Sequence, residues 1–93
     1  MIRVVEVQQT CGGCPSQWEG QTDDGRAVYA RYRYGKLWVG LSEPGGTVDD
    51  AVVATIEKRS TVHKIIGDEY DGWMEYDELQ EHTAGVIEWP TDG

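Results

Sequence analysis

The residues of this chain best suited to chemistry lie between 26 and 41 (RAVYARYRYGKLWVGL). Tyr34-Gly35 in the middle of this stretch predicts the two-residue turn of a β-hairpin, because Gly readily adopts the positive φ that such a turn requires. The turn sets the register of the two strands. On one face, the register pairs Arg33 with Lys36, Arg31 with Trp38, and Tyr29 with Gly40.

The chemistry that this face offers is the binding of a flat, anionic molecule. Arginine and lysine hold phosphate groups, and the rings of Trp and Tyr stack on bases. A cation such as Arg31 opposite Trp38 can also stabilise the hairpin by about 0.5–1 kcal/mol. We therefore expect a small anionic or nucleotide-like ligand at a site made of Tyr29, Arg31, Arg33, Lys36 and Trp38.

The alternative interpretation of this face is the ordinary solvated side of an antiparallel sheet. Two observations favour a site. A solvated face has no need of two large aromatic rings, and four of the chain's eight cations fall within residues 26–36 although the net charge is −9. The opposite face of the hairpin is predicted to be its core face, with Val28, Ala30, Tyr32, Leu37, Val39 and Leu41.

The motif CGGC at residues 11–14 is the candidate metal site. Two thiolates leave two positions of a tetrahedral zinc site unfilled. The set that could fill it, and that would make the protein a small metal-dependent hydrolase, is Cys11, Cys14, His63 and His82. Because the separations match no zinc-finger spacing, we favour a tight turn with buried thiols, and we expect no catalytic residue and no cofactor.

Negative charge is concentrated in the second half of the chain. Residues 1–41 have five Lys/Arg and four Asp/Glu, whereas residues 42–93 have three and thirteen. This balance disfavours direct binding to nucleic acid or to an anionic membrane. It gives a second hypothesis, an acidic inhibitor that mimics nucleic acid and covers a basic host protein through Asp68, Glu69, Asp71, Glu75, Asp77 and Glu78. For residues 67–72 alone, a solvated turn is favoured over a site for a divalent cation.

Length and patterning predict one α+β domain over residues 1–93. We expect an antiparallel meander of four to five strands with one or two short helices on one face. Strands are predicted at 2–7, 17–22, 26–33, 36–41, 61–66 and 86–89. Helices are predicted at 48–59, where Thr47 and Asp50 form a capping signal, and at 73–83. For residues 48–59, the β-branched side chains leave a strand as the alternative.

The chain has no run of the ~18 apolar residues that a membrane-spanning helix needs. Its start (MIRVVEVQQT) has the pattern of a strand and not of a signal peptide. We therefore expect a cytoplasmic protein, in the host cytoplasm if a phage encodes it. A homo-oligomer stays open, since a core of this size is small.

Three segments, CPSQWEG, DDGR and YARYRYGKLWV, resemble a set of short proteins of actinobacteria and their phages for which no activity is established. Residues 14–39 contain nearly all of the resemblance, and GDEYDG at 67–72 extends it. The resemblance implies a phage or prophage accessory protein. By analogy with other small phage proteins, it implies an anti-defence inhibitor that acts by stoichiometric binding and not by catalysis.

Overall fold

The computed structural model describes residues 1–12, 16–57 and 59–90. Over these ranges the chain forms six strands and two helices. In chain order they are β1 (Ile2–Gly12), β2 (Ser16–Thr22), β3 (Ala27–Arg33), β4 (Lys36–Leu41), α1 (Val48–Ile56), β5 (Val62–Ile65), α2 (Tyr76–His82) and β6 (Ile87–Glu88). In the described ranges, neither helix combines the length and the apolar character that crossing a membrane would demand.

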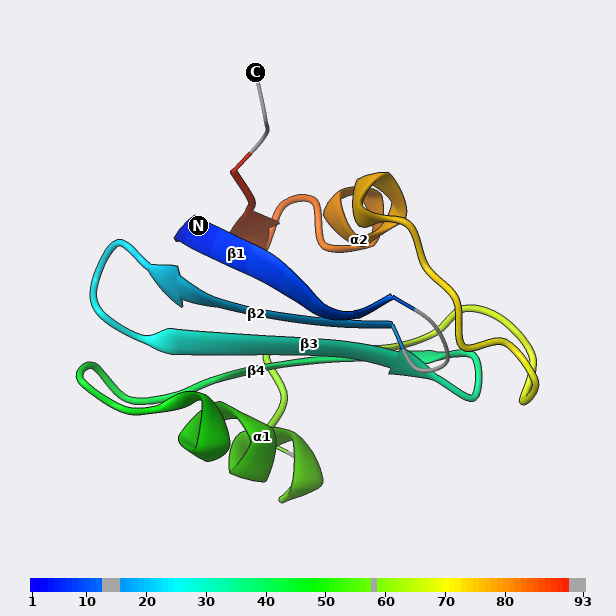
Figure 1. Ribbon diagram of the computed structural model, residues 1–93, viewed down its shortest axis with the longest axis horizontal. Coiled ribbons are helices and arrows are strands. Elements are labelled where there is room, and N and C mark those ends of the chain that lie inside the picture. Colours follow the sequence, from blue (N-terminus) through cyan, green and yellow to red (C-terminus); the bar gives the residue numbers. More distant parts are fainter. Residues whose placement is uncertain (13–15, 58, 91–93) are drawn as a thin grey trace.

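All six strands form one curled sheet in the order β5-β4-β3-β2-β1-β6 (Figure 1). Neighbours are antiparallel except for β1 and β6, which are parallel. The predicted α+β class with an antiparallel-rich sheet is confirmed. The sheet has six strands where four to five were expected, because the segments at 62–65 and 87–88 both join it as edge strands.

The β3–β4 hairpin has the predicted register. Arg31 faces Trp38, Tyr29 faces Gly40, and Arg33 faces Lys36. The turn residues Tyr34 and Gly35 have φ angles of 56° and 71°, as a two-residue hairpin turn requires. On the predicted core face, Val28, Ala30, Tyr32, Leu37 and Val39 are at most 1% exposed, and Leu41 packs against them.

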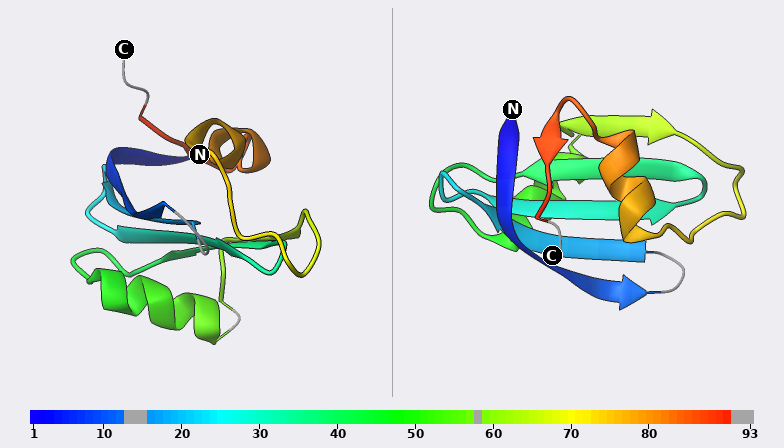
Figure 2. Two further views of the ribbon diagram at one scale, coloured as in Figure 1. Left: turned by 45° about the vertical axis from the view of Figure 1, so that its right-hand side comes forward. Right: turned by 90° about the horizontal axis from the view of Figure 1, so that it is seen from above.

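The two helices lie on opposite faces of the sheet, which corrects the expectation that they share one (Figures 1 and 2). Helix α2 covers the core face, where Met74 and Leu79 join the buried cluster. Helix α1 packs on the other face, against Gly40. A Cβ at Gly40 would lie 2.4 Å from the Ala51 carbonyl oxygen, so the missing side chain is what allows this close approach.

Helix α1 begins with the predicted capping box. The Asp50 carboxylate accepts a hydrogen bond from the Thr47 backbone N–H at 2.9 Å, and Asp50 N–H donates to the Thr47 hydroxyl at 3.4 Å. The helix ends at Ile56, three residues earlier than predicted. Its buried residues are Ala51 and Ala54, because only small side chains fit this close to the sheet.

Helix α2 begins at Tyr76 and not at the predicted Trp73. Met74, which lies before the helix, is buried as expected, whereas Trp73 is 57% exposed. The Glu78 carboxylate accepts a hydrogen bond from the Glu75 backbone N–H at 3.3 Å and so caps the first turn. The segment before the helix is therefore a loop and not the first turn of a helix.

Candidate functional site

A ladder of three side chains crosses β3, β4 and β5 on the face opposite the core. Trp38 on β4 pairs with Arg31 on β3 and with His63 on β5. The rings of Trp38 and His63 are stacked, with centroids 5.6 Å apart and planes 11° from parallel. Antiparallel pairing places these side chains next to one another, so the ladder follows directly from the register of the sheet.

Helix α1 covers only one end of this face. Its nine residues lie over the end of the hairpin near Gly40 and stop at Ile56. Beyond the end of the helix, the ladder becomes the floor of a recess of about 590 Å³. The recess is lined by Arg31, Lys36, Trp38, Thr55, Ile56, Ser60 and His63.

The cations of this face have no carboxylate partner among the described residues. The ion pairs found there are Arg26–Asp24 and Arg59–Glu57, neither of which involves the face. The Nε atom of Arg31 is buried and has no hydrogen-bond partner in the described structure. A buried guanidinium nitrogen without a hydrogen-bond partner costs free energy.

Tyr29 does not take the role that the sequence predicts for it. Tyr29 is 7% exposed and pairs with Gly40, where α1 packs on the sheet, so it offers no ring face to a ligand. Burial raises the pKa of the Tyr29 hydroxyl, and the nearby charge of Arg31 partly offsets that rise. The hairpin register was predicted correctly, whereas both helices were expected on one face of the sheet and α1 lies on the face opposite α2.

The other four predicted residues remain on the open part of the face. Arg31, Lys36 and Trp38 line the recess together. Arg33 lies outside the lining, and its guanidinium carbon is 4.6 Å from the centroid of the Tyr34 ring. The cation–π contact found among the described residues therefore joins Arg33 and Tyr34. It is not the predicted contact of Arg31 with Trp38, whose ring stacks on His63.

Sequence reasoning missed four lining residues: Thr55, Ile56, Ser60 and His63. One signal for His63 was present. Residues 61–66 were predicted as a strand, and pairing that strand with β4 in the observed register places His63 opposite Trp38. The other three come from the end of α1 and the segment after it, and their place depends on the face to which α1 docks.

The structure does not bring together the three described residues of the alternative metal set, Cys11, His63 and His82. Cys11 is on β1 and His63 is on β5, four strands apart in the sheet, which corresponds to about 19 Å. His82 is the last residue of α2, which lies on the core face of the sheet, opposite the recess. Cys14 lies outside the described residues. No group of three or more His, Cys, Asp or Glu that could hold a metal occurs in residues 1–12, 16–57 and 59–90.

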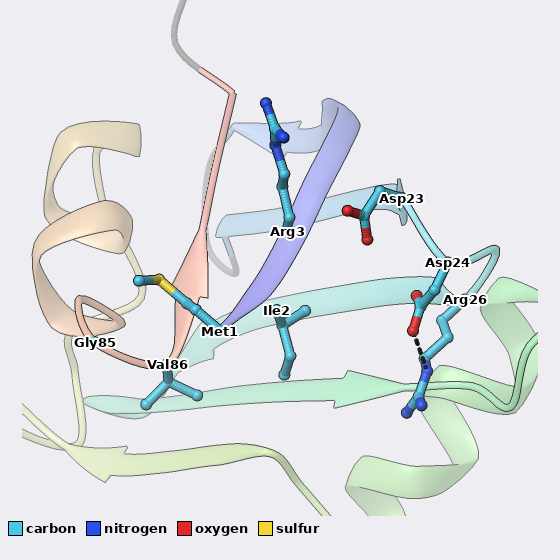
Figure 3. Close-up of a pocket in the computed structure, with 8 residues that line it drawn as sticks. All are labelled: Met1, Ile2, Arg3, Asp23, Asp24, Arg26, Gly85 and Val86. Carbon is cyan, nitrogen blue, oxygen red and sulfur yellow. Dashed lines mark hydrogen bonds and ion pairs between the residues drawn. The ribbon is translucent and has the colours of Figure 1, made fainter.

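A second hollow, of about 470 Å³, lies at the edge formed by the start of β1 and the β2–β3 turn (Figure 3). Asp24 is paired there with Arg26, at 3.0 Å between Oδ2 and Nε. The Thr22 hydroxyl, which donates to Asp24, and the charge of Arg26 lower the pKa of this carboxyl. Two Arg and two Asp side chains balance one another in this lining, so the hollow lacks the excess positive charge of the recess.

The six acidic residues of the second hypothesis lie in the loop before α2 and in its first turn. Asp71 accepts a hydrogen bond from the Tyr32 hydroxyl at 2.6 Å, and Glu78 caps the helix. Glu75 accepts from the indole N–H of Trp73 at 3.0 Å. Asp68, Glu69 and Asp77 are exposed.

Comparisons of this chain with protein-family models, with curated proteins and with solved structures give no match. Function is therefore inferred from the arrangement of its side chains. Two surfaces are candidates: the recess with its cations and stacked rings, and the acidic loop before α2.

Proposed function

We propose that the protein binds a small nucleotide-like anion in the recess and holds it without converting it. The observation that supports this most directly is the buried Nε of Arg31, which has no partner among the described residues and lies next to the Trp38–His63 stack. The volume of about 590 Å³ also falls within the range of small-molecule sites.

Each side of the recess has a distinct role in this proposal. The guanidinium of Arg31 and the ammonium of Lys36 hold phosphate oxygens, since charge-assisted hydrogen bonds are the strong ones. The Trp38–His63 pair contacts the planar base from the floor. Ile56, which is 73% exposed at the end of α1, gives the opposite wall an apolar surface.

The biological setting of the proposal comes from the resemblance of residues 14–39 to short phage and actinobacterial proteins. A small protein that binds one nucleotide per chain removes a host signalling molecule in proportion to its own amount. Sequestration of such a signal is one way in which a phage accessory protein blocks host defence. Binding in the recess does not depend on this biological setting and is tested on its own.

Native mass spectrometry of the protein mixed with a bacterial nucleotide extract tests for the ligand. We expect a discrete added mass on the wild-type protein that is lost in Arg31→Gln and in Lys36→Gln. For the nucleotide identified, calorimetry should show a loss of about 10–100-fold in affinity for each variant, the size expected for one charge-assisted hydrogen bond. Arg3→Gln removes the same charge from an exposed side chain in the other hollow and serves as the matched control.

Two results would overturn the proposal. One is the absence of any nucleotide adduct on the wild-type protein. The other is an adduct that Arg31→Gln keeps at wild-type affinity, because the ligand would then lie elsewhere. Circular dichroism of each variant establishes that a loss of binding does not reflect a loss of fold.

A further inference from the structure

The loop between β5 and α2 presents two large aromatic side chains to solvent. Tyr70 is 86% exposed and Trp73 is 57% exposed. Aromatic rings of this size normally bury most of their surface, and Tyr and Trp are enriched among the anchor residues of protein interfaces. The two rings therefore need an explanation that the recess does not give.

The backbone that presents these rings is fixed to the turn of the hairpin. The amides of Ile66 and Gly67 donate to the Gly35 carbonyl at 2.7 and 3.0 Å. The Gly35 amide in turn donates to the Asp71 carbonyl at 2.7 Å. A Cβ at Gly35 would lie 2.3 Å from the Gly67 carbonyl oxygen, so this packing requires glycine there.

The far side of the loop is fixed to β2 and β3. The Ser16 amide donates to the Gly72 carbonyl at 2.9 Å, and the Met74 amide donates to the Ser16 hydroxyl at 3.0 Å. The Tyr32 hydroxyl donates to the Asp71 carboxylate at 2.6 Å. A loop held at both ends in this way loses little conformational entropy when a partner binds to it.

Carboxylates flank the two rings along the chain, and Glu75 contacts the indole of Trp73. Asp71, Glu75 and Glu78 have hydrogen-bond partners within the protein. Glu69 and Asp77 are exposed and have no side-chain partner among the described residues, so their charges face outward. Aromatic anchors with a charged rim have the composition of a protein interface, and the sign of the rim selects a basic partner.

We infer that Tyr70 and Trp73 anchor a partner protein with a basic surface. The site shares no residue with the recess, and it refines the acidic inhibitor hypothesis by assigning the binding energy to two rings and the steering to Glu69 and Asp77. Nucleic acid is excluded as the occupant by the sign of the charge. A second copy is disfavoured because each chain has a net charge of −9.

A displayed library of random peptides, selected on the immobilised protein, tests this site with a defined probe. We expect the recovered peptides to combine Lys or Arg with apolar residues. Their affinity should fall at least about tenfold in the double variant Tyr70→Ala/Trp73→Ala, and it should weaken as salt is raised. The control is Val53→Ala, which shortens an exposed apolar side chain on α1. This variant should bind the peptides as tightly as the wild-type protein does.

Recovered peptides that lack basic residues, or that bind the double variant as tightly as wild type, would overturn the inference. Sedimentation of the wild-type protein adds a second readout. Self-association that the double variant abolishes would assign the two rings to a second copy instead. Arg31→Gln should leave peptide binding unchanged, so failure of the nucleotide site and failure of this surface are distinguishable.

Discussion

The recess and the loop at residues 66–75 both depend on the β3–β4 hairpin, but they use different parts of it. The recess uses side chains on one face of the strands, where pairing places Arg31 beside Trp38. The loop uses the backbone of the turn, through the amide and the carbonyl of Gly35. One surface is cationic and the other anionic. A small acidic chain can thus keep two surfaces of opposite charge on one hairpin.

The largest effect should come from Gly35→Ala, which breaks the attachment of the loop. Gly35 has a φ of +71°, and its new Cβ would meet the carbonyl oxygens of Gly67 and Asp68 at 2.3 and 2.4 Å. Backbone strain at such a position costs about 1–3 kcal/mol, and the collision adds to it. We expect the free energy of unfolding, measured in urea, to fall by about 3 kcal/mol or more.

Gly45→Ala separates strain from collision in this experiment. Gly45 also has a positive φ, +83°, but a Cβ there would meet nothing within 4 Å. It should therefore cost only the strain, about 1 kcal/mol. If the two variants lose the same stability, the loop does not press on the turn as described.

The β3–β4 hairpin and the cations on its face were predictable because the residues that determine them are close together in the sequence. A Tyr-Gly turn with flanking alternation sets the register, and the register alone places Arg31, Lys36 and Trp38 on one face. The capping box at Thr47 and Asp50 is likewise a signal within four residues. Local signals of this kind predict that the strands and helices exist and that the class is α+β, but not all of their ends: β1 runs to Gly12, α1 stops at Ile56 and α2 begins at Tyr76.

The remaining features were not predictable because they depend on contacts between distant residues. The Tyr32–Asp71 hydrogen bond joins residues 39 positions apart, and Met74 reaches Ser16 across 58 positions. The face chosen by α1, which buries Tyr29 and forms the wall of the recess, depends on the fit between Gly40 and Ala51. No periodicity in residues 48–59 contains that information.

Gly40→Ala should have the second largest effect, and it tests the recess alone. Gly40→Ala would place a Cβ 2.4 Å from the Ala51 carbonyl oxygen and 2.8 Å from Cγ2 of Thr55, which forces α1 away from the sheet. Overpacking of this kind costs about 2 kcal/mol. Because Thr55 and Ile56 line the recess, nucleotide affinity should fall as well, in a titration followed by calorimetry. Peptide binding at Tyr70 should stay at its wild-type value, and a parallel loss there would show that the two surfaces are coupled.

Tyr32→Phe should affect the loop and spare the recess, the reverse of Gly40→Ala. It removes the Tyr32 hydrogen bond to Asp71 and leaves that carboxylate with the longer one from the Trp73 backbone N–H, at a cost of about 1.5 kcal/mol. Peptide binding at the loop should weaken, while nucleotide binding in the recess should not change. Equal losses at both surfaces would contradict the separation proposed for them.

Tyr32 also makes the stability of the protein depend on pH. Burial, followed by the hydrogen bond and the charge of Asp71, raises the pKa of the Tyr32 hydroxyl well above its ordinary value of 10. The folded state therefore holds this proton more tightly than the unfolded state. Its contribution to stability is complete below pH 10 and is lost as the pH rises above that value. Urea unfolding across this range should show a steeper decline for the wild-type protein than for Tyr32→Phe, and parallel declines would exclude the assignment.

The smallest effect should come from Thr47→Ala at the start of α1, far in the chain from the loop. The variant removes the hydroxyl that accepts from the Asp50 amide and donates to its carboxylate, and such a cap contributes about 1 kcal/mol. Thr47→Ser keeps the hydroxyl and should keep the stability. Since α1 forms one wall of the recess, fraying its first turn should lower nucleotide affinity only slightly and leave the loop untouched. A large loss of nucleotide affinity in Thr47→Ala but not in Thr47→Ser would mean that the recess depends on the whole length of the helix and not only on its last turn.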